Sequence, residues 1–237
     1  MKISKSVMAA LASVAIAAPL AVAATINGTD NSDVLRGTAK SDTVNALAGN
    51  DVVQGFRGWD TLRGQDGNDV VDGNLGNDKV VGGIGDDVLS GGQGGDIMWG
   101  QEDNDVMFGG PGPDRMGGGS GDDREYGGLG NDTIWLGTGS DVAFAGPGHD
   151  LVMSLAMDNT VDYIFCGRGW DVAWIRSEDK ADRSCERVII VNTATPTDPE
   201  NAEVLPTLPP LPAGAAKARR GNPNAGAPDP SELADAS

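Results

Sequence analysis

The sequence predicts an all-β chain of stacked coils, and three observations predict it. A nine-residue register runs through residues 28–153 without insertion or deletion, which makes fourteen units. Glycine dominates positions one, two and four of the unit, and position eight is apolar in thirteen of the fourteen. Glycines permit the positive φ of a tight turn, and one inward side chain between two outward neighbours follows the period of a β-strand. Such short strands bury little alone, so the units are expected to stack as repeats.

The sixth position of every unit is Asp, and this is the third observation. The first two units carry Asp33 and Asp42. The other twelve units carry Asp51, Asp60, Asp69, Asp78, Asp87, Asp96, Asp105, Asp114, Asp123, Asp132, Asp141 and Asp150. Carboxylates at this density repel one another in a compact fold unless cations bind between them. Oxygen ligands suit a hard cation such as calcium.

Two units show the full repeat pattern, G-G-x-G-x-D-x-U-x. They are residues 82–90, Gly-Gly-Ile-Gly-Asp-Asp-Val-Leu-Ser, and residues 127–135, Gly-Gly-Leu-Gly-Asn-Asp-Thr-Ile-Trp. Over about half of its length, the sequence therefore resembles the RTX, or haemolysin-type, calcium-binding repeat family. The resemblance implies a right-handed parallel β-roll in which two nonapeptides form one coil. Fourteen units then give about seven coils of eighteen residues.

The resemblance also implies where calcium binds. The ions would lie between successive turns on the same edge of the roll, held by position-six carboxylates and backbone carbonyls. The twelve aspartates from the third unit onward are the expected ligands, and we call them the candidate ligands. Six intervals on each edge set an upper bound of about twelve calcium ions.

The stacking of residues eighteen apart predicts a core of two inner rows. One row comprises Leu35, Val53, Val71, Leu89, Met107 and Ala143. The facing row comprises Val44, Leu62, Val80, Met98, Met116, Ile134 and Val152. Glu125 is the single break in the apolar position. Because a buried carboxylate is costly, we expect a locally shifted strand that exposes Glu125, with a role as an unusual ligand as the alternative.

The turns are not expected to bind calcium equally. Position four is Asn31, Lys40 and Asp103 in three units, where the others have Gly. Asn and Asp tolerate the left-handed backbone better than Lys does, and Lys40 adds a cation. Residues 28–45 are therefore expected to bind calcium weakly or to cap the N-terminal end, and the best sites are expected within residues 46–135.

Residues 1–23 are predicted to be a secretory signal peptide. Lys2 and Lys5 precede an apolar run rich in small residues, as in export signals. A transmembrane anchor is the alternative, which Pro19 and the short length of the run disfavour. The mature protein is therefore expected to be secreted, extracellular or at the cell surface, where disulfides persist.

The calcium-binding roll is expected to span residues 24–153. Residues 154–192 are interpreted as a degenerate repeat followed by a C-terminal cap. Cys166 and Cys185 are predicted to form a structural disulfide that closes a loop of eighteen intervening residues, worth roughly 3 kcal/mol. A reactive thiol pair is the alternative. Residues 193–237 are rich in Pro and Ala and are predicted to be a disordered tail.

Composition narrows the function classes. The net charge is −18, from 35 acidic and 17 basic residues, which makes nucleic acid an unexpected partner. The only histidine, His149, has no nucleophile and base pattern around it, so no enzyme activity is expected. The expected function is an extracellular calcium-binding protein that folds on binding several ions and serves as a structural or surface-interaction module. The alternatives are an accessory domain of a secreted enzyme or toxin, an adhesin, and an ice-binding roll.

One outer face of the predicted roll is unusually apolar. It carries Val88, Val106, Phe108, Val142 and Phe144 at positions seven and nine of odd-numbered units. Contiguous apolar strips often mark contacts, so this face is expected to dock a partner, a second copy, or the proline-rich part of the tail, residues 204–212. The alternative is that Val simply favours strands on an exposed ladder.

Overall fold

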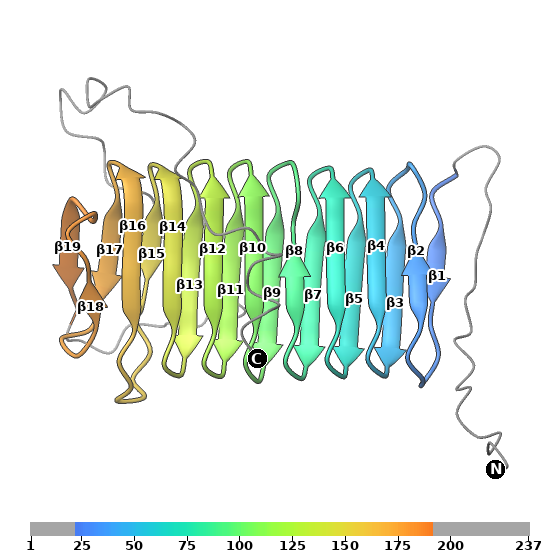
Figure 1. The fold of residues 1–237 in the computed structure, drawn as a ribbon, viewed down its shortest axis with the longest axis horizontal. Helices are drawn as coiled ribbons and strands as arrows, with labels where there is room; N and C mark the ends of the chain where they lie inside the picture. Colours follow the sequence, from blue (N-terminus) through green and yellow to red (C-terminus); the bar gives the residue numbers. More distant parts are fainter. Residues whose placement is uncertain (1–21, 192–237) are drawn as a thin grey trace, which may run out of the picture.

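The computed structural model describes residues 22–191, which form a parallel β-solenoid of two facing sheets (Figure 1). The predicted all-β roll is confirmed. Within these residues, no helix is long and apolar enough to cross a membrane. The predicted tail and all but the last two residues of the predicted signal peptide lie outside the described residues.

Consecutive strands alternate between the two sheets, and every pair of neighbouring strands is parallel. One sheet contains, in order, β1 (Thr25–Asn27), β3 (Thr43–Ala48), β5 (Thr61–Asp66), β7 (Lys79–Ile84), β9 (Ile97–Glu102), β11 (Arg115–Ser120), β13 (Thr133–Thr138), β15 (Leu151–Met153), β17 (Val172–Ile175) and β19 (Arg187–Ile190). The other contains β2 (Val34–Arg36), β4 (Val52–Arg57), β6 (Val70–Leu75), β8 (Val88–Ser90), β10 (Val106–Pro111), β12 (Arg124–Leu129), β14 (Val142–Gly148), β16 (Tyr163–Gly169) and β18 (Lys180–Ala181).

The chain makes about nine turns, since the sheets hold ten and nine strands, so the prediction of seven coils is too low. Through the regular repeats, partners are eighteen residues apart, as with Val52 and Val70. After β14 the spacing becomes 21 residues, as with Val142 and Tyr163. The three extra residues lie in the connection between β15 and β16. The last two strand pairs are closer in sequence, 17 residues apart for Tyr163 and Lys180 and 15 for Val172 and Arg187, and parallel pairing continues to β19.

The core is a narrow double row of position-eight side chains between the sheets. All thirteen predicted apolar core residues are buried, with exposed fractions of 2 % or less. The alternation of strand geometry accounts for this, because successive side chains point to opposite faces. In β6, for example, Val71 is buried between the exposed Val70 and the half-buried Asp72. The two predicted inner rows are confirmed.

Glu125 lies fully inside the roll, which corrects the expectation of a shifted strand that exposes it. Its exposed fraction is 0 %, and β12 pairs in register with β10 and β14. A shift of one residue would turn Arg124 and Tyr126 inward. Tyr126 is held on the outer face by stacking between Phe108 and Phe144, with ring centroids 5.0 and 5.1 Å apart. The register of the ladder therefore keeps the Glu125 side chain in the core.

The predicted disulfide between Cys166 and Cys185 is confirmed. Their sulfur atoms are 1.98 Å apart and the Cα atoms 5.0 Å apart. Cys166 points inward from β16, and Cys185 lies between β18 and β19. The bond thus ties the last short strands to the body of the solenoid.

Candidate functional site

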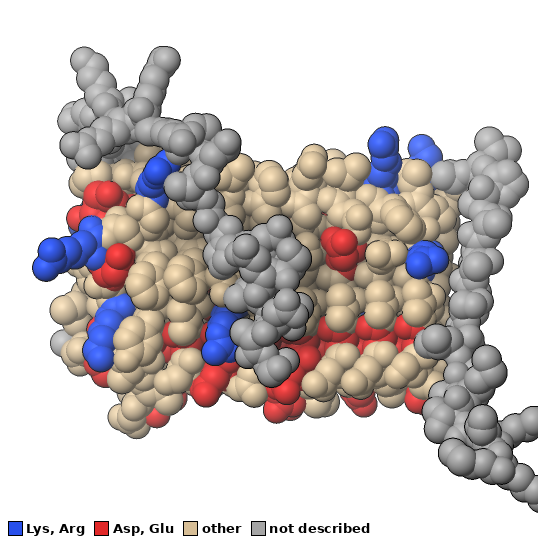
Figure 2. Space-filling model, in the orientation of Figure 1, with Lys and Arg blue, Asp and Glu red and all other residues tan. Residues whose placement is uncertain are grey.

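The position-six aspartates form two ladders, one along each turn edge. Each Asp shares the inward parity of position eight, and all twelve candidate ligands are 2 % exposed or less. On one edge, the backbone N–H of Asp51 donates to Oδ1 of Asp69, and that of Asp69 donates to Oδ1 of Asp87, both at 2.7 Å. The other edge repeats this arrangement, with the N–H of Asp60 donating to Oδ1 of Asp78 at 2.7 Å. Figure 2 shows acidic side chains in a band along one turn edge, with few basic side chains near it.

The second carboxylate oxygen, Oδ2, is buried and without a hydrogen-bond partner in all twelve candidate ligands. In the nine candidate ligands whose unit begins with glycine, it points toward that glycine, whereas the units of Asp51, Asp141 and Asp150 begin with the buried Ala46, Leu136 and Ala145. A β-carbon placed on Gly64 would lie 2.2 Å from Asp69 Oδ2 and 2.9 Å from the carbonyl oxygen of Gly82. Glycine is therefore required at position 64, because a side chain would fill the space on which these oxygens converge. Buried oxygens that meet no donor need a proton or a cation.

Side-chain carboxylates alone do not enclose a metal ion. Among residues 22–191, no three His, Cys, Asp or Glu side chains come together as potential metal ligands. Calcium, however, takes six to eight oxygen ligands and accepts backbone carbonyls among them. The convergence of Asp69 Oδ2 with the carbonyl of Gly82 supplies both kinds of oxygen. A calcium ion fits this donor set, in which turn carbonyls supplement one or two carboxylates.

The electrostatics of the ladders favour a bound positive charge. Burial raises the pKa of Asp87 to about 7, that of Asp105 to about 8 and that of Asp141 to about 9. In each case the backbone N–H of the preceding ladder aspartate lowers the pKa, and neighbouring carboxylates raise it. Near neutral pH the rows must therefore take up protons, carry charge at a cost, or bind cations.

The first two turns differ from those of the twelve candidate ligands. The backbone N–H and the Oγ1 hydroxyl of Thr29 donate to Asp33 Oδ2 at 2.7 and 2.9 Å. In the next unit, the N–H of Thr38 donates to Asp42 Oδ2 at 2.5 Å. In these two turns, donors from the chain satisfy Oδ2. The same atom has no hydrogen-bond partner in the candidate ligands, from Asp51 onward.

The backbone at position four separates the first two turns from most of those that follow. Asp103 adopts the left-handed conformation, with φ of 74°. Asn31 and Lys40 are not among the described residues with positive φ. The first two turns therefore differ from most of the later ones at position four, in backbone path, and at position two, in the threonine donors.

Sequence reasoning missed the continuation of both ladders beyond Asp150. The N–H of Asp141 donates to Oδ1 of Asp162, and that of Asp150 donates to Oδ1 of Asp171, both at 2.9 Å. Asp162 lies three residues beyond the position that the strict register assigns, because the insertion precedes it. Its Oδ2 accepts a hydrogen bond from Ser154 Oγ at 2.5 Å, whereas Asp171 Oδ2 has no hydrogen-bond partner. When the nine-residue register resumes three residues later, position six is Asp162 and then Asp171, and this spacing is the signal for both in the sequence.

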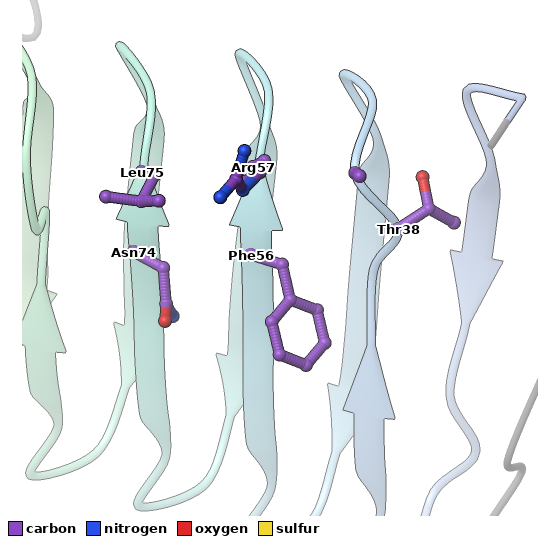
Figure 3. A pocket seen from close by; sticks show the side chains of 6 residues that line it. Thr38, Phe56, Arg57, Asn74 and Leu75 are labelled. Atoms are coloured by element: carbon purple, nitrogen blue, oxygen red, sulfur yellow. The ribbon is translucent and has the colours of Figure 1, made fainter.

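Two other features lie apart from the ladders. A shallow hollow on one turn edge is lined by Thr38, Ala39, Phe56, Arg57, Asn74 and Leu75 (Figure 3). This lining contains no carboxylate. His149 lies just before β15, and its Nδ1 accepts a hydrogen bond from the N–H of Trp170 at 2.9 Å. These contacts give His149 a role in turn structure.

Comparison with known families agrees with this geometry. A family model described as the RTX calcium-binding nonapeptide repeat matches in four copies, at residues 27–55, 54–89, 81–116 and 117–152. Together the copies span more than half of the 237 residues. They cover all fourteen repeat units except the last residue of the fourteenth. No curated protein matches the chain.

Proposed function

Because the chain belongs to the RTX calcium-binding nonapeptide repeat family, we propose that it is an extracellular protein that folds as calcium fills the turns of its roll. Repeats of this family bind calcium, and their β-roll is a structural calcium-binding module rather than a catalytic fold. The observation that carries the proposal is the row of buried Oδ2 atoms without hydrogen-bond partners in the candidate ligands. A divalent cation would supply the positive charge that these oxygens lack.

The coupling of folding to calcium follows from the charge of the ladders. Without cations, carboxylates that are brought into stacked turns must either repel one another or take up protons. The unfolded chain lacks preformed turns, so the binding free energy contributes directly to folding. The twelve candidate ligands, together with turn carbonyls, are the proposed calcium ligands. The number of ions is at most about twelve, and Asp171, whose Oδ2 also lacks a hydrogen-bond partner, is a further proposed ligand.

Removal of calcium tests this proposal. The mature chain is dialysed against chelator, then titrated with calcium or magnesium while β-structure is followed by circular dichroism and bound metal is counted by elemental analysis. We expect little β-structure in chelator and a cooperative gain with calcium. Magnesium is expected to substitute poorly, because it prefers rigid octahedral geometry and retains its water. Equal β-content with and without calcium would contradict the proposal.

Export of the protein is supported by two observations. Residues 1–23 have the charge and hydropathy pattern of a secretory signal, and the Cys166–Cys185 disulfide belongs to oxidising compartments. Expression of the full chain in a secreting host should yield protein in the medium with a new N-terminus near residue 24. Retention of residues 1–23 in the mature product would count against export by this signal.

The outer face of the nine-stranded sheet supports a second proposal, a role in surface interaction or self-association. Val88 is 41 % exposed and Phe144 is 36 % exposed. Val88 lies in a row of position-seven valines, and Phe144 lies in the adjacent row of stacked rings, with 4.9 Å between the centroids of Phe144 and Phe165. The double substitution of Val106→Lys and Phe108→Ser should weaken contacts through this face. Unchanged oligomeric state and surface adhesion in calcium would end this second proposal. Residues 204–212, expected earlier as another occupant, lie outside the described residues.

A further inference from the structure

Glu125 is a buried carboxylate that the regular repeat does not explain. It projects from β12 into the core with an exposed fraction of 0 %. Neither Oε1 nor Oε2 has a hydrogen-bond partner among the described residues. Burial raises its pKa well above the usual value, and the nearby Asp141 and Asp123 add to this effect. An isolated buried carboxylate is costly, so its retention calls for a partner of another kind.

The Glu125 carboxylate reaches the same space as a ladder oxygen. A β-carbon placed on Gly118, in β11, would lie 2.3 Å from Asp123 Oδ2, 2.5 Å from the carbonyl oxygen of Leu136 and 2.7 Å from Glu125 Oε1. Three oxygens therefore converge beside Gly118, and the two carboxylate oxygens meet no donor. The absence of a side chain at Gly118 leaves the room that the Glu125 carboxylate occupies.

The coils on either side lack this third oxygen. In the preceding coil of the same sheet, position eight is Met107, which carries no oxygen, and the oxygens nearest a β-carbon on Gly100 would be Asp105 Oδ2 and the carbonyl of Gly118. In the following coil, position eight is Ala143. The additional carboxylate is thus confined to one turn of the roll.

We propose that Glu125 is a ligand to the calcium ion at the turn of residues 118–123, where one repeat then contributes two carboxylates, Asp123 and Glu125. This inference rests on the proposed calcium-binding function. Calcium sites gain affinity with the number of charged oxygen ligands. The apolar surroundings exclude water and strengthen the attraction between ion and carboxylates. The site at residues 118–123 is therefore the tightest of the roll and the last to release its ion.

The test uses the full mature chain and its Glu125→Met variant, which carries the side chain of the equivalent Met107. Bound calcium is counted after competition with a series of chelators, and calcium release is followed by stopped-flow. We expect the tightest ion of the wild-type protein to bind at least about tenfold more weakly in the variant, since even the loss of outer-shell partners costs 10- to 100-fold. The matched control, Leu89→Met in β8, changes a position-eight side chain without removing an oxygen and should leave the tightest ion unaffected.

Glu125→Gln provides a second variant that keeps the shape of the side chain and one neutral oxygen. It should bind the tightest ion with intermediate affinity, and it remains informative if Glu125→Met does not fold. Wild-type affinity and release rate in either folded variant would overturn the inference, and Glu125 would then be a protonated acid of the core. Failure of the wild-type protein to bind any calcium would instead defeat the proposed function, so the two failures are distinguishable.

Discussion

The two turns at the N-terminal end and the turns from residue 46 onward place the same aspartate in the same ladder, yet they treat its second oxygen differently. At Asp33 and Asp42, Oδ2 accepts hydrogen bonds from Thr29 and Thr38. From Asp51 onward it has no hydrogen-bond partner in any candidate ligand. The carboxylate of a turn is therefore satisfied in one of two ways. A threonine at position two satisfies it with donors from the chain, and a glycine-rich turn leaves the oxygens available to a cation.

The hydrogen-bonded turns at the N-terminal end are suited to begin the roll. A solenoid needs an end coil that is stable without a neighbour on one side. Turns that satisfy their own carboxylates meet this need without a bound ion. We therefore expect the first coil to serve as a calcium-independent template on which the calcium-dependent coils stack.

The largest effect is expected when one aspartate is replaced in each of the two kinds of turn. Asp87→Ala removes a carboxylate whose Oδ2 lacks a donor, and we expect it to raise the calcium concentration at the folding midpoint several-fold, because two neighbouring sites lose a ligand. Asp42→Ala should barely change the calcium requirement. It should instead lower the stability in saturating calcium by about 1 kcal/mol for each hydrogen bond that Asp42 accepts from Ala24 and Thr38.

Calcium titrations followed by circular dichroism, combined with urea unfolding in saturating calcium, measure both quantities. Asp96→Ala serves as the matched control on the opposite edge and should behave like Asp87→Ala. Equal shifts of the calcium midpoint for Asp42→Ala and Asp87→Ala would contradict the division between the two kinds of turn.

The register of the roll was predictable because each repeat imposes the same constraint. An inward Asp, an inward apolar residue and a glycine turn recur every nine residues, and the family resemblance implies that two units form one coil. The core rows and the order of both ladders followed from these two facts together. The disulfide was predictable because the chain has only two cysteines. The calcium role of the candidate ligands stays a proposal, since position in a ladder does not establish occupancy.

The nine-residue pattern did not predict features that depend on contacts with neighbouring strands or on local turn geometry. The burial of Glu125 follows from the in-register pairing of β12 on both sides, whereas its charge alone favoured exposure. Asp162 and the two additional turns were hidden by a three-residue insertion that the connection before β16 absorbs. The hydrogen bonds of Thr29 and Thr38 depend on a local turn path that composition does not specify.

A smaller effect is expected from pH in the absence of calcium. The folded pKa values of Asp78 and Asp87 are raised to about 7, and that of Asp105 to about 8, chiefly by burial. Because these values exceed the unfolded value of 3.8, the folded chain binds more protons. Stability is then fully present below pH 3.8 and is lost as the pH rises through about 7 to 8. Chelator-treated protein should therefore gain β-structure on acidification from pH 8 toward pH 4.

Circular dichroism across this pH range in chelator measures the effect. Asp87→Asn removes one titrating group while keeping the side-chain shape, so it should reduce the steepness of the pH dependence. A loss of β-structure between pH 8 and pH 5 in the wild-type protein would contradict the assigned cause.

The smallest expected effect concerns the backbone of the two kinds of turn. Gln65, at position two, has φ of 81°, and its partner in the next coil of the sheet is Gly83. The left-handed conformation costs a residue other than glycine roughly 1 kcal/mol or more, so Gln65→Gly should stabilise the calcium-loaded roll by up to about 1 kcal/mol. Thr38, also at position two, is not among the described residues with positive φ. Thr38→Gly should therefore destabilise, because glycine adds backbone entropy to the unfolded chain without relieving strain. Urea unfolding in saturating calcium measures the stability of both variants. Changes in stability of the same sign would show that position two is alike in both kinds of turn.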